Sequence, residues 1–245
     1  GFDYIANKPS NSNAKMDGQI LDVQKNWKLG EDSMVLGYSY QREGIDLPEQ
    51  KRSVVRTGNS LYASYSKQFT PRFNVTLGLR GELINDPAKD QNVFMPQIQT
   101  EYKFDHNTAW YTNIGKAFQM PTVDDVTRHQ NLRGTQLKPE EGWTYETGVK
   151  LRRGKDTWKA AIYHMDMKDK LTWKQDSRTK EYYMANTGNY RNTGVEVEYA
   201  RRFNDMWKLT VGGSISNPEG QDPSTPKKEW EQVSSRFEGL VRLDY

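Results

Sequence analysis

Three histidines are the side chains of this sequence best suited to proton transfer, nucleophilic attack or metal binding. His106 lies in a short turn, His129 in a long polar stretch and His164 in a segment of alternating residues. Catalysis needs a nucleophile, a base and an orienting acid held together, yet no HExxH, GxSxG or phosphate-loop motif occurs. We therefore predict a protein that is not an enzyme and that has no resident cofactor or metal centre.

Charged side chains form a second group, because they recur at every second position of several segments. In 73–83 and 143–151 they alternate with apolar residues, and the same spacing appears in 191–203. Residues two apart lie on one face of a β-strand. The mixed signs of this face favour salt bridges over an open anion or cation pore, and its simplest role is the polar lining of a water-filled barrel. The set consists of Arg80, Glu82, Glu146, Lys150, Glu196 and Glu198.

The elements that carry these side chains are predicted to be strands throughout. Alternating segments recur along the whole chain, whereas helical spacing is hard to find. We expect strands at 17–29, 33–42, 58–69, 73–84, 93–104, 108–118, 142–153, 157–168, 191–203, 207–216 and 235–245. The fold class is therefore all-β.

The connections between the strands alternate between short and long. Short turns, with the Gly, Pro, Asn and Asp that tight turns require, are expected at 30–32, 70–72, 105–107, 154–156 and 204–206. Long polar loops are expected at 43–57, 85–92, 119–141, 169–190 and 217–234. This alternation puts all turns at one end of the strands and all loops at the other. It is typical of antiparallel up-and-down transmembrane barrels, whereas Greek-key sandwiches do not sort their loops in this way.

The composition bears on which solvent surrounds the apolar face. Hydrophobic residues are 34% of the chain while aromatic residues reach 12%, and no spare segment exists to cover the apolar strand faces. We therefore predict that Val75, Leu77, Val149 and Val197 face outward into lipid. A girdle at the turn end is expected from the aromatic residues that flank the short turns. They are Trp27, Phe69, Phe73, Phe104, Trp110, Trp158, Phe203 and Trp207.

Two other classes of protein agree less well with the sequence. A soluble all-β binding module remains an alternative, because alternation alone fits either solvent. Nucleic-acid binding is not expected, because 35 basic and 32 acidic residues are spread evenly and leave a net charge of only +3.

Four segments of the sequence resemble the TonB-dependent outer-membrane receptors, which import siderophores, heme and cobalamin. They occur in the order found in that family and are specific in combination. They are "SLYASYSKQFTPRFNVTLGLRGE" (60–82), "TAWYTNIGKAFQMPT" (108–122), "LKPEEGWTYETGVKLR" (137–152) and "ANTGNYRNTGVEVEY" (185–199). The motif positions are Phe118, Pro121, Leu137, Pro139, Glu140, Tyr145, Gly148, Asn186, Gly188 and Gly194.

The resemblance implies a bacterial outer-membrane barrel of about 22 strands around a plug, energised by a TonB-type protein that acts through the plug. Residues 1–245 contain about half that number of strands, with residues 2–6 as the tail of a twelfth. We therefore expect a partial barrel domain without the plug, ending before the last strands. Unpaired edges would favour self-association of such a piece. A passive porin-like or adhesive barrel is the alternative within the membrane class.

The resemblance also implies an iron complex as the transported ligand, either heme or a ferric siderophore. Heme receptors of this family carry an F-R-A-P box, a loop histidine and an N-P-N-L box. Here Phe118 and Pro121 keep the ends of the first box, and His129 follows in the loop, where an imidazole can ligate iron. Aromatic and basic loop residues would instead bind a siderophore. They are Arg128, Arg133, Tyr182, Tyr183, Tyr190 and Arg191.

Overall fold

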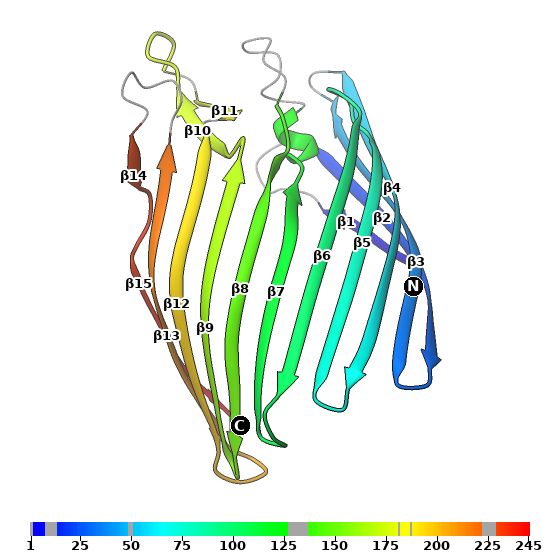
Figure 1. Cartoon of the computed structure of the whole chain (residues 1–245). Helices are drawn as coiled ribbons and strands as arrows, with labels where there is room; N and C mark the ends of the chain where they lie inside the picture. Colours follow the sequence, from blue (N-terminus) through cyan, green and yellow to red (C-terminus); the bar gives the residue numbers. More distant parts are fainter. Residues whose placement is uncertain are drawn as a thin grey trace.

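The computed structural model describes residues 2–7, 14–48, 51–126, 137–180, 182–186, 188–221 and 229–245. Nearly all of them belong to antiparallel strands (Figure 1). The strands are β1 (Phe2–Asn7), β2 (Lys15–Leu29), β3 (Asp32–Leu47), β4 (Arg52–Thr70), β5 (Phe73–Asn85), β6 (Gln91–Lys103), β7 (Thr108–Gln119), β8 (Glu140–Arg153), β9 (Asp156–Lys168), β10 (Leu171–Gln175), β11 (Tyr182–Asn186), β12 (Asn189–Arg202), β13 (Lys208–Gln221), β14 (Trp230–Gln232) and β15 (Phe237–Asp244).

One large curved sheet contains all strands except β10 and β11. Its order follows the chain from β1 to β9 and continues with β12 and β13, and β13 pairs with β14 at one end and with β15 along the rest of its length. The predicted all-β, up-and-down architecture is confirmed. The predicted twelfth strand is also present, because β1 pairs with β2 from Phe2 to Asn7. Among the described residues, no helix is long and apolar enough to cross a membrane.

The five short turns lie where they were predicted, at the lower end of the sheet in Figure 1. Gly30 and Gly154 adopt φ angles of +70° and +58°, a conformation that side chains with a Cβ rarely adopt. In the β6–β7 turn, Asp105 Oδ1 accepts hydrogen bonds from the backbone amides of Asn107 (2.7 Å) and Thr108 (2.8 Å). The bond from Asn107 holds the pKa of the Asp105 carboxyl below its ordinary value.

Two of the long loops, predicted at 43–57 and 217–234, are shorter than predicted because strands continue past the predicted ends, whereas the connections predicted at 85–92 and 119–141 lie close to their predicted bounds. The predicted loop 43–57 is largely strand, since β3 runs to Leu47 and β4 begins at Arg52. Likewise β13 runs to Gln221 instead of ending at 216. The extension of β13 is polar, whereas the extensions of β3 and β4 carry the buried side chains of Ile45, Leu47 and Val54 on the inner face. Backbone pairing thus persists beyond the point where apolar residues alternate on the outer face.

Two of the long connections contain structure of their own. Within 169–190, strands β10 and β11 form a separate two-stranded hairpin. Within 119–141, residues 123–126 form one helical turn, which begins after Thr122, and the Asp125 amide donates to Thr122 Oγ1 at 3.0 Å. Val123 of this turn packs with Ala14, Ile45, Leu47 and Val54 of the β2–β4 region. The β7–β8 connection is therefore folded back onto the sheet.

Strands β6 and β7 are hydrogen-bonded to each other along only part of their length. They pair from Gln97–Gly115 to Lys103–Ala109, although both strands continue upward beyond this ladder. Pro96 is the first residue of β6 beyond this ladder, and proline has no N–H to donate to a neighbouring strand. Beyond the paired part of β6 and β7, Phe118 lines a cavity of about 210 Å³ together with Arg56 from β4 and Ile84 from β5.

Candidate functional site

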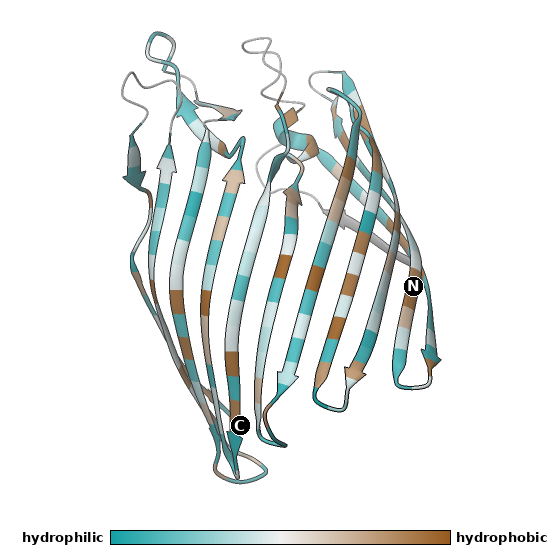
Figure 2. Cartoon of the chain, in the orientation of Figure 1, coloured by the Kyte–Doolittle hydropathy of each residue, from teal (hydrophilic) through white to brown (hydrophobic). Residues whose placement is uncertain are grey.

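One face of the sheet is apolar and open to solvent. Side chains on this face alternate along each strand with polar ones, which Figure 2 shows as bands of brown and teal. Leu77, Val149 and Val197 have 53%, 41% and 47% of their surface exposed, and Val75 shares the face of Leu77 but is half-buried. None of them lies in a closed core. The large hydrophobic side chains are thus placed on the outside of the curved wall.

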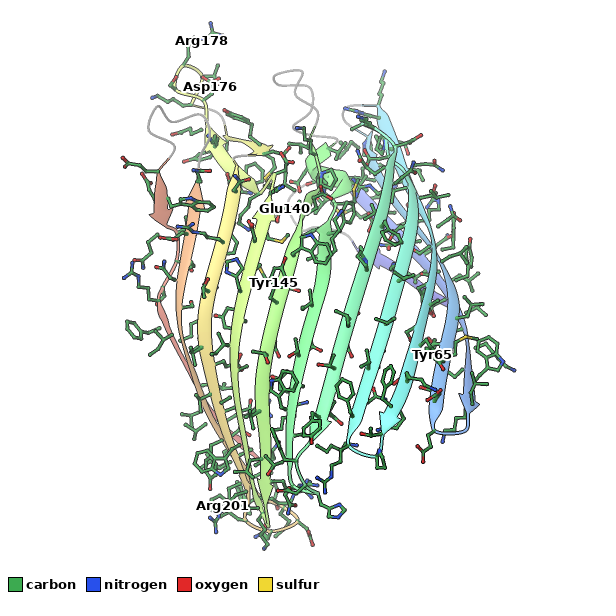
Figure 3. All side chains as sticks on the ribbon, viewed as in Figure 1. Tyr65, Glu140, Tyr145, Asp176, Arg178 and Arg201 are labelled. Carbon is green, nitrogen blue, oxygen red and sulfur yellow. The ribbon has the colours of Figure 1, made fainter. Side chains whose placement is uncertain are left out.

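Aromatic rings border the apolar face near both ends of the strands. At the turn end, Phe73 lies 5.9 Å from Phe69 and 6.5 Å from Tyr102, and Trp158 lies 4.3 Å from Tyr199, between ring centroids. Toward the loop end, Tyr145 contacts Trp143 and His164 at 6.4 and 6.1 Å (Tyr145 is labelled in Figure 3). Such borders suit the two interfaces of a bilayer.

The opposite face is polar and more buried because the sheet curves around it. On β4 and β5, Arg80 donates to Ser60 Oγ at 2.7 Å and to Glu82 at 3.3 Å. Its guanidinium lies 5.8 Å from the centre of the Tyr62 ring, and Tyr62 donates to Asp22 at 3.0 Å. This network joins β2, β4 and β5 across the inner wall.

All six charged residues predicted to line the lumen share this inner face. In the strand registers Arg80 and Glu82 face Tyr62 and Ser60, Glu146 faces Tyr163, and Glu196 faces Ala161. Lys150 and Glu198 lie opposite Lys159 from the two sides of β9, and the Lys150 ammonium also lies 4.6 Å from the centre of the Tyr111 ring. The inner wall therefore carries both signs of charge at similar heights.

Three tyrosines of the inner face lie across glycines directly opposite them on the next strand. The pairs are Tyr62 with Gly37, Tyr111 with Gly148, and Tyr163 with Gly194. In each pair a Cβ on the glycine would collide with the tyrosine ring. The glycines thus let large rings lie flat against the wall, as aromatic rings do over glycines in other sheets.

We expect Gly148→Ala to lower the free energy of unfolding by about 1–3 kcal/mol, because the added Cβ would overpack the inner wall. It would lie 2.5 Å from the Ala160 carbonyl oxygen, which belongs to the backbone, and 2.8 Å from Tyr111 Oη. Gly81→Ala is the matched control, because nothing lies within 4 Å of a Cβ there. Urea unfolding of the folded protein in detergent measures both. Equal stability of the two variants would contradict the close packing.

A buried ion pair ties the β7–β8 connection to the wall. Arg56 Nε donates to Asp86 Oδ2 at 2.6 Å, and the two side chains are only 7% and 2% exposed. Arg56 Nη1 donates to the Pro121 carbonyl at 2.7 Å, and Glu43 lies 3.4 Å from the same nitrogen. No sequence motif predicted this ion pair. Its only signal was the position of Arg56 two residues after Val54, on the same strand face.

The family-motif residues near the loop end contact one another across 48 positions of sequence. Asn186 accepts from the Lys138 amide and donates to the Lys138 carbonyl, both at 2.8 Å, and it also donates to the Asp169 carbonyl at 2.6 Å. Glu140 is buried and accepts from the Leu171 amide at 2.6 Å. The Lys170 amide donates to the Gly188 carbonyl at 2.9 Å. These bonds clamp the β10–β11 hairpin onto the start of β8.

The remaining motif residues lie around this clamp and below it. Leu137 is buried beside Lys138 and Pro139, whereas Pro121 carries the carbonyl bound by Arg56. Gly148 and Gly194 lie under tyrosine rings further down the wall. Gly188 has a φ of +118°, which explains a glycine there.

The described residues predicted to bind a ligand lie on different strands and on different faces of the sheet. Tyr182 and Tyr183 lie in β11 at the loop end. Tyr190 was expected in a loop but belongs to β12, where it shares the inner face and lies 5.0 Å from the Lys170 ammonium. Arg191 lies on the outer face, bound to Glu219 at 2.7 Å and stacked 4.1 Å from the Trp230 ring. It therefore points away from the lumen.

Three of the predicted ligand-binding residues, Arg128, His129 and Arg133, lie outside the described residues. Of the other histidines, His106 is in the β6–β7 turn, and His164 on the outer face lies 2.7 Å from Thr193 Oγ1. In the described ranges, no group of three or more His, Asp or Glu side chains could hold a metal ion.

A curved antiparallel wall with an exposed apolar outer face, aromatic borders and a polar inner face defines the class of transmembrane β-barrels. Within this class, the family model described as "TonB dependent receptor-like, beta-barrel" matches residues 2–237. The chain therefore belongs to the TonB-dependent receptor β-barrel family. The family consists of receptors, which agrees with the prediction that the chain is not an enzyme.

Solved structures with similar folds are transporters and receptors. The siderophore receptor PirA from Pseudomonas aeruginosa is 16% identical, with a TM-score of 0.72, over 89% of this chain and 46% of that one. The FrpB iron transporter from Neisseria meningitidis (F3-3 variant) is 17% identical, with a TM-score of 0.70, over 90% and 37%. The copper transporter OprC is 14% identical, with a TM-score of 0.68, over 86% and 39%. The chain thus spans less than half the length of these proteins. No curated protein sequence matches it.

Proposed function

We propose that this chain forms part of the wall of a bacterial outer-membrane receptor that takes up an iron complex. The observation that carries this proposal is the division of the sheet into an apolar outer face and a charged, hydrogen-bonded inner face. Membership of the TonB-dependent receptor family and the iron and siderophore transporters among similar folds support it. In this function the outer face contacts lipid, and Arg80, Glu146 and Glu196 line the path or contact a plug.

Energy for uptake would come from a TonB-type protein that acts through the plug. A passive porin-like barrel is the competing function, and the two differ in their dependence on energy. We expect uptake of the iron complex by the full-length protein to cease in cells that lack the TonB-type protein. Uptake that continues unchanged in those cells would establish a passive pore.

The ligand we propose is heme or a ferric siderophore, and His129 is the test residue for heme. The full-length protein is titrated with heme and with several ferric siderophores, and the titrations are repeated with His129→Ala. His106→Ala is the matched control, because His106 lies in the β6–β7 turn, at the opposite end of β7 from the β7–β8 connection. If heme is the ligand and His129 binds its iron, only His129→Ala weakens heme binding and changes the Soret band. Unchanged heme binding would remove His129 as a ligand, and binding of a siderophore alone would identify that class.

A further inference from the structure

The inner face carries a group of cations at the turn end whose role is separate from the loops and from the lumen charges above it. Arg152, Lys155, Arg202 and Lys208 line a cavity of about 320 Å³, together with Gly154, Thr157 and Ala200. The four basic side chains come from β8, β12 and β13 and from the β8–β9 turn. No acidic side chain of the described chain lines this cavity.

The floor of the cavity is fixed by bonds between two hairpin turns. Lys155 Nζ donates to the Phe203 carbonyl at 2.7 Å, and the Arg202 amide donates to the Lys155 carbonyl at 3.0 Å. These contacts join the β8–β9 turn to the end of β12. The cations are thus held on a cross-linked backbone and do not extend from independent loops.

Two neighbouring acids, Asp244 and Asp156, are occupied by other cations. Asp244 lies opposite Lys208 in the β13–β15 register, but its carboxylate is bound by Arg242 at 3.2 Å. Asp156 is bound by Arg201 at 3.3 Å and by Tyr199 at 2.7 Å on the outer face. Within the described chain, Arg152, Arg202 and Lys208 have no ion pair.

Adjacent arginines therefore have opposite environments. Arg201, labelled at the turn end in Figure 3, is neutralised on the outer face, whereas Arg202 points to the inner face and has no ion pair with any described residue. In the same area Thr210, opposite Ala200, is buried and its hydroxyl has no hydrogen-bond partner among the described residues. Unpaired cations gathered in a cavity bind oxyanions, and arginine binds them through two parallel hydrogen bonds.

We propose that this cavity is an oxyanion-binding site at the turn end of the inner wall. Its ligand is a phosphate group or a pair of carboxylates, held by Arg152, Arg202 and Lys208, with Lys155 at the floor. The phosphate would belong to a small molecule, and the carboxylates to an acidic peptide segment. Both present the same chemistry to the site, and neither depends on an iron complex being the transported ligand.

The test is calorimetric titration of the full-length protein in non-ionic detergent with pyrophosphate and, separately, with a tetra-glutamate peptide. We expect at least one of them to bind, with an affinity that falls as ionic strength rises. Arg202→Gln and Lys208→Gln should each weaken binding about tenfold, because each removes a charge-assisted hydrogen bond. Arg201→Gln is the matched control, and we expect it to change binding by less than about twofold, because its charge is on the other face.

The two probes distinguish a small-molecule phosphate from an acidic peptide segment. Preferential binding of pyrophosphate identifies a small-molecule phosphate, and preferential binding of the peptide identifies an acidic segment. The proposal is overturned if the unmodified protein binds neither probe, or if Arg201→Gln weakens binding as much as Arg202→Gln. If Arg202→Gln does not fold, as judged by circular dichroism, Lys208→Gln and Arg152→Gln provide the same measurement.

Discussion

Arg56→Ala is expected to lower the free energy of unfolding by about 3–5 kcal/mol, because it leaves a buried carboxylate without its cation. Asp86 is only 2% exposed, and Arg56 Nε is its cationic partner at 2.6 Å. The backbone amides of Ala88 and Lys89 also point at Asp86, at 2.8 and 3.4 Å, but they cannot neutralise its charge. The Pro121 carbonyl would also lose its donor.

The Arg42–Asp17 ion pair is the matched control for this experiment. Its side chains are 30% and 37% exposed, so we expect Arg42→Ala to cost about 1 kcal/mol or less. Urea unfolding measures both variants, and limited proteolysis reports whether residues 120–126 leave the wall. The double variant Arg56→Met with Asp86→Leu should recover most of the loss, because apolar groups can replace a buried ion pair. Equal costs for Arg56→Ala and Arg42→Ala would show that the Arg56 pair is solvated.

Val197→Arg is expected to lower the free energy of unfolding in lipid vesicles by about 2–4 kcal/mol, the cost of an arginine near the bilayer midplane. Val197 lies in the middle of the apolar outer face, between Val195 and Tyr199 along β12. Its neighbours in register, Ala160 and Gly213, are also uncharged. Among the described neighbours on the outer face, an arginine there has no carboxylate to pair with, and it has no short path to water.

Ser214→Arg provides the control on the inner face. Ser214 lies opposite Glu196 and Glu238 in the registers of β13, so the new arginine would meet water and negative charge. We expect its effect to lie within about 0.5 kcal/mol of zero. A cost for Val197→Arg no larger than that for Ser214→Arg would show that the apolar outer face meets water and does not contact lipid. That result would contradict the proposed location in a membrane.

Much of the fold followed from local patterns. Turn chemistry at Gly30 and Gly154 placed the hairpins, and the spacing of Leu77, Val149 and Val197 identified the apolar face. The predicted loop at 43–57 was wrong because strand pairing in β3 and β4 outlasts the apolar alternation of the outer face. Arg191 was assigned to a ligand-binding loop although it lies on the outer face beside Glu219. A shift of one position reverses the face of a strand residue, so an error at a strand end can place a residue on the wrong face of the sheet.

The sequence by itself determined the strands, their turns and the division into a polar and an apolar face, because these depend on neighbours one to four positions away. Only the tertiary structure decided which residues meet: Arg56 with Asp86 and Pro121, Lys138 with Asn186, and Arg202 with Lys155 and Lys208. Such contacts depend on the register between strands and on the folding back of a loop. Register is set jointly by all the strands of the sheet, so no single segment of the sequence contains it.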